Sequence, residues 1–72
     1  MRPHAIADFA ARIRAMRSQH DGLLSRGVAF AREGRAIPRV LADEIADSAG
    51  RIRAHEAVLA GLVADAGKAG GR

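Results

Sequence analysis

The side chains best suited to chemistry in this 72-residue chain are His20, Ser48 and His55. A serine beside a histidine can act as a nucleophile with its general base, and two histidines can begin a metal site. The chain has no cysteine, and no Asp or Glu shares the spacing of the three, so a site with three or four ligands lacks its donors. We therefore expect no metal, and interpret the three side chains as polar groups that fix helix register and partner choice.

A small-molecule site is not expected either. The glycines near Lys68 do not form a phosphate-binding loop, because Ala69 stands where that loop requires Ser or Thr. A hydrolase also needs an oxyanion hole and a substrate cleft, for which so short a chain has little room. The sequence thus predicts a non-enzymatic protein with no catalytic residue, no cofactor and no small-molecule substrate.

Arginine supplies most of the positive charge. The formal net charge is +4, but residues 5–66 contain nine Arg and eight acidic residues, which leaves a small excess. A basic surface repeated by dimer symmetry would suit phosphate groups. The two aromatic residues, Phe9 and Phe30, occupy helix-seam spacing and are not expected to stack on bases. The arginines expected to form one basic band across paired helices are Arg12, Arg14, Arg17, Arg51 and Arg53.

Apolar residues recur at alternating spacings of three and four in both halves of the chain, which is typical of heptad helices. With 28% of residues charged, sixteen random positions would hold about four charges, whereas these hold none. Five Ile, four Val and no Thr leave little from which to build a sheet. The two seams are Ile6, Phe9, Ile13, Met16, His20, Leu23, Gly27 and Phe30, and Leu41, Ile45, Ser48, Ile52, His55, Leu59, Leu62 and Ala66.

Helix-ending signals divide the chain into two. Gly34 suits the left-handed residue after a helix, and Pro38 suits the start of the next. We expect a helix over about 4–33, a turn at 34–38, a second helix over about 39–66 and a flexible tail at 67–72. A connection this short makes the helices antiparallel. The predicted fold is an all-α two-helix hairpin in a single domain, residues 1–66, with a break near Gly22 as the alternative.

The seams are expected to pair along their whole length. Facing residue numbers then add up to about 72, which places Gly27 opposite Ile45, Phe9 opposite Leu62 and His20 opposite Ile52.

Apolar residues beside each seam predict a second buried surface, because a hairpin covers only one stripe of each helix. We expect the hairpin to complete a four-helix bundle with a second copy or to dock on a larger helical protein. It would then act as an adaptor, assembly factor, small chaperone or inhibitor. The alternative is a homodimeric, nucleic-acid-binding four-helix bundle that uses the arginine band. The residues expected in the interface are Ile13, Leu24, Val28, Ile45, Ile52, Val58, Leu59 and Val63.

The distribution of charge also predicts location. A membrane-spanning helix needs about 20 apolar residues, and no uncharged stretch approaches that length. Asp8, Arg12 and Arg14 interrupt the apolar core that a secretory signal would need. We therefore expect a cytoplasmic protein that does not associate with membranes.

Overall fold

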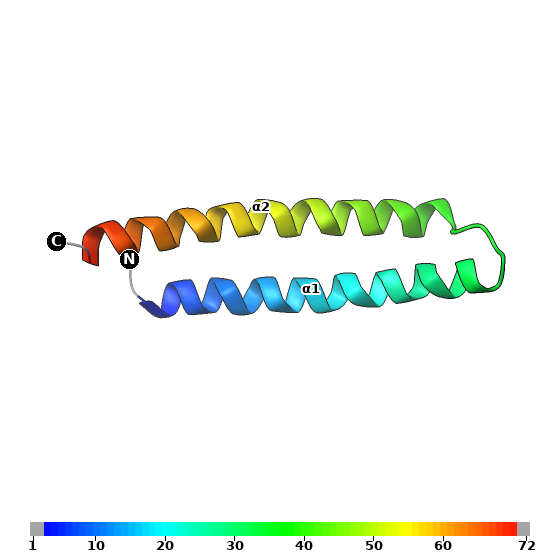
Figure 1. Cartoon of the computed structure of the whole chain (residues 1–72), viewed down its shortest axis with the longest axis horizontal. Coiled ribbons are helices and arrows are strands. Elements are labelled where there is room, and N and C mark those ends of the chain that lie inside the picture. Colours follow the sequence, from blue (N-terminus) through cyan, green and yellow to red (C-terminus); the bar gives the residue numbers. More distant parts are fainter. Residues whose placement is uncertain (1–2, 71–72) are drawn as a thin grey trace.

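The computed structural model describes residues 3–70, and side chains from residue 5 to residue 68. Two helices, α1 (Pro3–Arg32) and α2 (Arg39–Gly70), account for all of its regular structure. They lie side by side in opposite directions and are joined at one end by a short connection (Figure 1). The predicted all-α helical hairpin is therefore confirmed.

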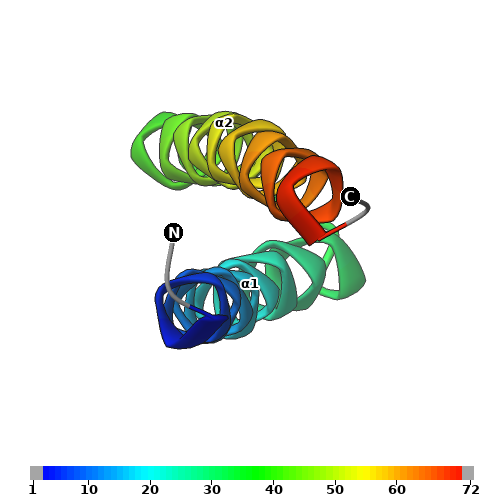
Figure 2. The same ribbon diagram turned by 90° about the vertical axis from the view of Figure 1, so that its left-hand side faces the viewer.

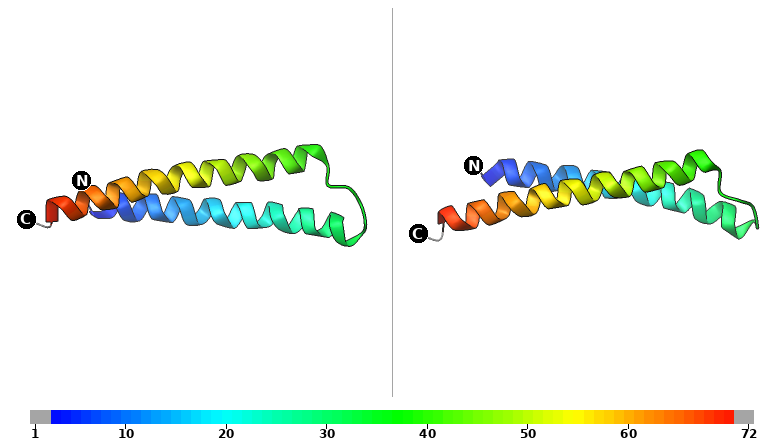
Figure 3. Two further views of the ribbon diagram at one scale, coloured as in Figure 1. Left: turned by 45° about the horizontal axis from the view of Figure 1, so that its top comes forward. Right: turned by 90° about the horizontal axis from the view of Figure 1, so that it is seen from above.

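The molecule is a rod rather than a globule. Its principal extents are 58 × 15 × 15 Å, and the view along the long axis shows α1 and α2 side by side (Figure 2). Seen from above, α1 and α2 cross near their middles (Figure 3). At every level each helix therefore has one helical neighbour.

The turn forms where Gly34 and Pro38 predict it. Gly34 has a φ of 68°, a conformation that glycine adopts without a Cβ penalty. Its N–H donates to the Ala31 carbonyl over 3.0 Å, and the Arg35 N–H donates to the Phe30 carbonyl over 2.9 Å. These two bonds define a Schellman motif, which satisfies the last carbonyls of α1. The Pro38 carbonyl accepts the first hydrogen bond of α2, from Ala42 N–H.

The core is a single line of side chains between the helices. Ile13, Leu41 and Ile52 are each exposed by less than a tenth. The same line contains Ser48, which is buried, and Gly27, whose missing side chain leaves room for Ile45 and Ile37. The seam predicted from the heptad spacing therefore contains the buried residues of the hairpin.

The two helices are longer and more regular than expected. Helix α1 runs unbroken through Gly22, so the three-helix alternative is wrong. Helix α2 continues past Gly67 to Gly70, so the tail predicted to begin at residue 67 is also wrong for residues 67–70. Residues 71–72 of that tail lie outside the described part of the chain. A single glycine costs a helix about 1 kcal/mol, which does not by itself end it.

The register agrees with the prediction at one level and shifts at others. A Cβ built on Gly27 would lie 3.5 Å from Ile45 Cδ1, as expected. His20 is bonded to Ser48, one helical turn from Ile52. The Phe9 ring packs on His55, two turns nearer the connection than Leu62. At the level of His20 the shift is four residues, or one helical turn. The spacing within each helix identifies the seam but does not say which levels of the two helices meet.

Neither α1 nor α2, within the described residues, contains a stretch apolar and long enough to span a membrane.

Candidate functional site

The polar side chains of the seam make structural contacts. His20 Nδ1 and Ser48 Oγ lie 3.1 Å apart and share a hydrogen bond between the helices. Ser48 is buried, and it lines neither of the two hollows found among the described residues. A serine nucleophile needs access to its substrate. We therefore interpret the pair as a buried polar contact between α1 and α2, as in the sequence analysis.

His55 does something different from His20. Its Nδ1–H donates to the Arg51 carbonyl over 2.8 Å, and its ring packs on Phe9 with centroids 5.6 Å apart. These contacts fix the ring within the hairpin. Among residues 5–68, no three His, Asp or Glu side chains come close enough to hold a metal ion.

The five arginines of the expected band are divided between two sides of the hairpin. Heptad phase places Arg14, Arg17 and Arg53 on one side of the seam, and Arg12 and Arg51 on the other. Arg17 forms an ion pair with Glu56. Arg17 and Arg53 line one hollow together with Asp21 and Glu56. The structure thus brings two of the arginines together, in a setting of mixed charge.

The expected interface residues also separate. Ile13 and Ile52 are buried against the other helix of the same chain, and Ile45 and Leu59 are partly buried. These four are unavailable to a partner while the hairpin is closed. Leu24, Val28, Val58 and Val63 remain exposed by 41%, 49%, 51% and 51%.

The exposed apolar residues follow one side of the hairpin more than the other. The ion pair between Arg17 and Glu56 shows that their heptad positions, which also hold Leu24 and Val63, lie on the same side. Six of the eight residues on this side are apolar, which makes it the surface suited to a partner. We call it the alanine flank: Ala10, Arg17, Leu24, Ala31, Ala42, Ala49, Glu56 and Val63.

The other side has the opposite character. Val58 lies there, but six of its nine residues are charged, so Val58 has mostly charged neighbours. We call it the charged flank: Ala5, Arg12, Gln19, Arg26, Glu33, Glu44, Arg51, Val58 and Asp65. The sequence alone shows apolar residues beside both seams without assigning them to one side or the other. The signal was available in the heptad positions once the helices are known to be antiparallel.

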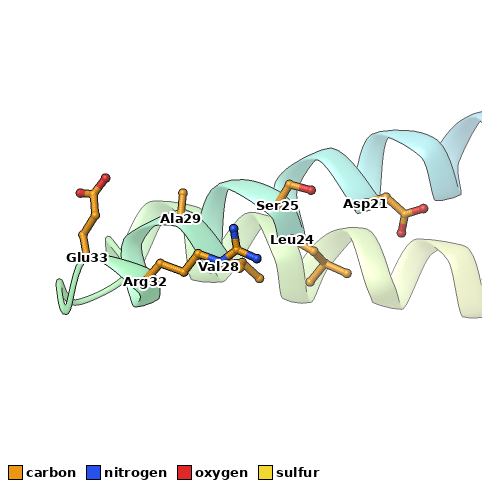
Figure 4. A pocket seen from close by; sticks show the side chains of 7 residues that line it. All are labelled: Asp21, Leu24, Ser25, Val28, Ala29, Arg32 and Glu33. Atoms are coloured by element: carbon orange, nitrogen blue, oxygen red, sulfur yellow. The ribbon is translucent and has the colours of Figure 1, made fainter.

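Two hollows adjoin the alanine flank. One, of about 560 Å³, is an open hollow over the outer surface of α1 near the connection, with Leu24 and Val28 among the residues that line it (Figure 4). A second hollow, of about 330 Å³, lies near the middle of the rod and has Ala49 and Ile52 in its wall. An apolar ridge beside shallow grooves is the type of surface on which another helix packs.

Comparison with known proteins finds no match: no family model, no curated protein and no solved structure is significantly similar to this chain.

Proposed function

We propose that this chain is a non-enzymatic protein–protein interaction module that binds a helical partner through the alanine flank. The single observation that carries the proposal is the contrast between the two flanks. Large apolar side chains are exposed on a side of the hairpin that is otherwise lined with alanine. Small residues allow a second helix to approach closely, and the large ones supply the apolar area that such contact buries.

The marginal size of the hairpin supports the same proposal. A chain of this length buries only about 60% of the surface that it exposes when unfolded, so its own core supplies a small net stability. This chain has no cysteine. An adaptor, assembly factor, small chaperone or inhibitor would gain its missing burial from the partner that it binds.

The proposed setting is the cytoplasm.

The experiment is native mass spectrometry of the chain purified from its own source, in three forms. The unchanged protein is expected in a complex larger than 7.6 kDa. Leu24→Asp should remove the partner, because binding would bury an unpaired charge. Ala54→Asp, on the outer side of α2, should retain it. A cooperatively folded single chain in all three samples would contradict the proposal.

Nucleic-acid binding by a homodimer is the alternative, and it has less support. Arg17 is already paired with Glu56, and the arginines do not share one side. If Arg14 and Arg53 contact phosphates, replacing both should reduce the slope of log affinity against log salt by about 2. A flat salt response, or no retention on heparin, would exclude this alternative.

A further inference from the structure

We propose that the helix that binds the alanine flank is amphipathic and carries acidic residues along the edge of its apolar stripe that faces α2. The occupant is a helix of another protein, with Glu or Asp bordering its apolar side chains. The inference rests on the proposed function, because it states the chemistry of the partner that binds that same surface. The charges along the borders of the flank carry it.

The mid-rod hollow shows which residues border the alanine flank. It is lined by Arg17, Ala49 and Glu56 of the flank, and also by Asp21 and Arg53. Asp21 and Arg53 each lie four residues after a flank residue and farther around their helix from the seam. Their heptad positions therefore form the outer borders of the flank. The α1 border is Ala7, Arg14, Asp21 and Val28, and the α2 border is Arg39, Ala46, Arg53, Ala60 and Gly67.

The α2 border is basic. Its charged residues are Arg39 and Arg53, both exposed, which lie fourteen residues apart, or about 21 Å along the helix. The ion pairs found among residues 5–68 join other arginines to their acids, so neither Arg39 nor Arg53 is paired. The remaining residues of this border are alanine or glycine, which leave both guanidinium groups accessible to a partner.

The α1 border selects no sign of charge. It holds one arginine and one acid, Arg14 and Asp21. A partner helix that lies along the flank has one edge beside each border. Its acidic edge is therefore expected beside α2, where acids about two heptads apart would meet Arg39 and Arg53.

The positive excess is confined to the side that exposes apolar residues. The alanine flank and its borders contain four arginines and two acids. The charged flank and its borders contain four basic and five acidic residues. The borders of the charged flank are Asp8, Ala15, Gly22 and Ala29 on α1, and Val40, Asp47, Ala54, Gly61 and Lys68 on α2.

Apolar side chains lie beside these arginines. Leu24 and Val63 are exposed within the flank, and Val28 is exposed on its α1 border. An occupant that uses both features must offer apolar side chains at its centre and negative charge at its edge, as an amphipathic acidic helix does. A nucleic acid offers phosphates but leaves Leu24 and Val63 uncovered. A second copy offers the same excess of arginine, which like-charge repulsion disfavours.

Binding of two synthetic peptides to the whole chain tests this inference. Both are amphipathic helices of about 21 residues, or about 32 Å, with the same stripe of Leu and Ala. One carries Glu along one edge of the stripe, and the other carries Lys at the same positions. Fluorescence anisotropy of the labelled peptides gives each Kd. The test variant is Arg39→Glu/Arg53→Glu, and the matched control is Arg26→Glu/Arg51→Glu, with the same change of charge on the charged flank.

We expect the Glu peptide to bind the unchanged protein at least about tenfold more tightly than the Lys peptide. The preference should disappear in Arg39→Glu/Arg53→Glu and stay within about twofold of its original value in the control, because charges on the far side of the rod are screened. Added salt should reduce the preference for the same reason.

Equal binding of the two peptides, no binding of either, or equal losses in the two double variants would overturn the acidic edge. Tighter binding of a DNA duplex than of the Glu peptide would overturn it in favour of nucleic acid, and a dimer of the chain alone in sedimentation equilibrium would overturn it in favour of a second copy. The proposed function has a separate test, because Leu24→Asp must remove the native partner whatever charge that partner's edge carries.

Discussion

The hydrogen bond between His20 and Ser48 places a polar pair inside an otherwise apolar seam. Removing one partner leaves the other part-buried and unsatisfied, which costs more than removing both. We expect Ser48→Ala to lower the free energy of unfolding by about 1–2 kcal/mol. His20→Leu/Ser48→Ala should recover most of that loss.

The measurement is urea unfolding followed by circular dichroism, at one protein concentration, for both single variants and the double variant. Energetic coupling between the two sites is the expected result. Additive effects would mean that the hydrogen bond does not link the helices.

Gly27 is buried in the seam, yet it has room for a methyl group. An added Cβ would lie 3.5 Å from Ile45 Cδ1 and 3.7 Å from Ile37 Cδ1, which is ordinary contact. Alanine is favoured over glycine inside a helix by about 0.8–1 kcal/mol. Gly27→Ala should therefore raise Tm by roughly 4–8 °C.

Gly22→Ala is the matched control, because a Cβ there meets nothing within 4 Å. Thermal unfolding should show a comparable gain for both variants. If Gly27→Ala lowered Tm while Gly22→Ala raised it, the seam would be more tightly packed than the structure describes.

At the scale of elements, the connection depends on one backbone conformation. Gly34 has the left-handed φ of 68°, which costs other residues roughly 1–2 kcal/mol. Arg35 then lies over the Phe30 ring, 5.0 Å from its centroid, in the place where a Schellman motif usually has an apolar contact.

Gly34→Ala should therefore destabilise the hairpin by about 1 kcal/mol, opposite in sign to the change at Gly27. Asn tolerates this conformation better than Ala, so Gly34→Asn should lose less. Chemical denaturation of the unchanged protein, Gly34→Asn and Gly34→Ala measures the order of their free energies of unfolding. An equal or higher stability for Gly34→Ala would contradict the assigned turn.

The seam itself is tested by placing a charge in it. Ile13 is 5% exposed, and an aspartate there would have no partner, which costs several kcal/mol. The Ile13→Asp variant should no longer fold into a hairpin that unfolds cooperatively, and it should not bind the partner. Leu59→Asp, at a partly buried position, should also unfold the hairpin.

Ala15→Asp provides the control, since residue 15 is exposed on the outer side of α1. Of the three variants, only Ala15→Asp should give the far-ultraviolet circular dichroism spectrum of a helical protein. An Ile13→Asp variant that stays folded and still binds the partner would show that the seam is wrongly assigned.

The sequence predicted these elements well, because their signals are local. Spacing located the seam that buries Ile13 and Ile52, and Gly34 with Pro38 located the connection. The register was predicted only to within about one helical turn, because the spacing within each helix does not say which levels of the two helices meet. The C-terminal end of α2 was predicted too early, because Gly67 was interpreted as the residue that ends the helix.

The candidate site was only partly predictable for a related reason. Leu24, Val28 and Val63 were recognised as apolar residues beside the seams. The side of the hairpin on which each of them lies depends on how the two antiparallel helices pair. The ion pair between Arg17 and Glu56 shows which heptad positions of α1 and α2 lie on the same side. Val58 was grouped with them although it lies on the charged flank.

At the scale of the whole molecule, a rod of two helices leaves most of each helix in contact with water. The 15 Å extents across the rod leave no room for a third layer that would cover Leu24 and Val28. Burial within one chain is therefore limited to a single seam. On the proposal that a partner covers the alanine flank, association adds stability, and the apparent stability then depends on the partner's concentration.

The most direct measurement of this account is thermal unfolding followed by circular dichroism across a thousandfold range of chain concentration. If the helical partner is a second copy, Tm should rise steadily with chain concentration, whereas the Tm of Leu24→Asp should stay at the value of the dilute protein. A sharp transition at one unchanging temperature, in both proteins and at every dilution, would mean that the hairpin folds alone and that no second copy covers its alanine flank.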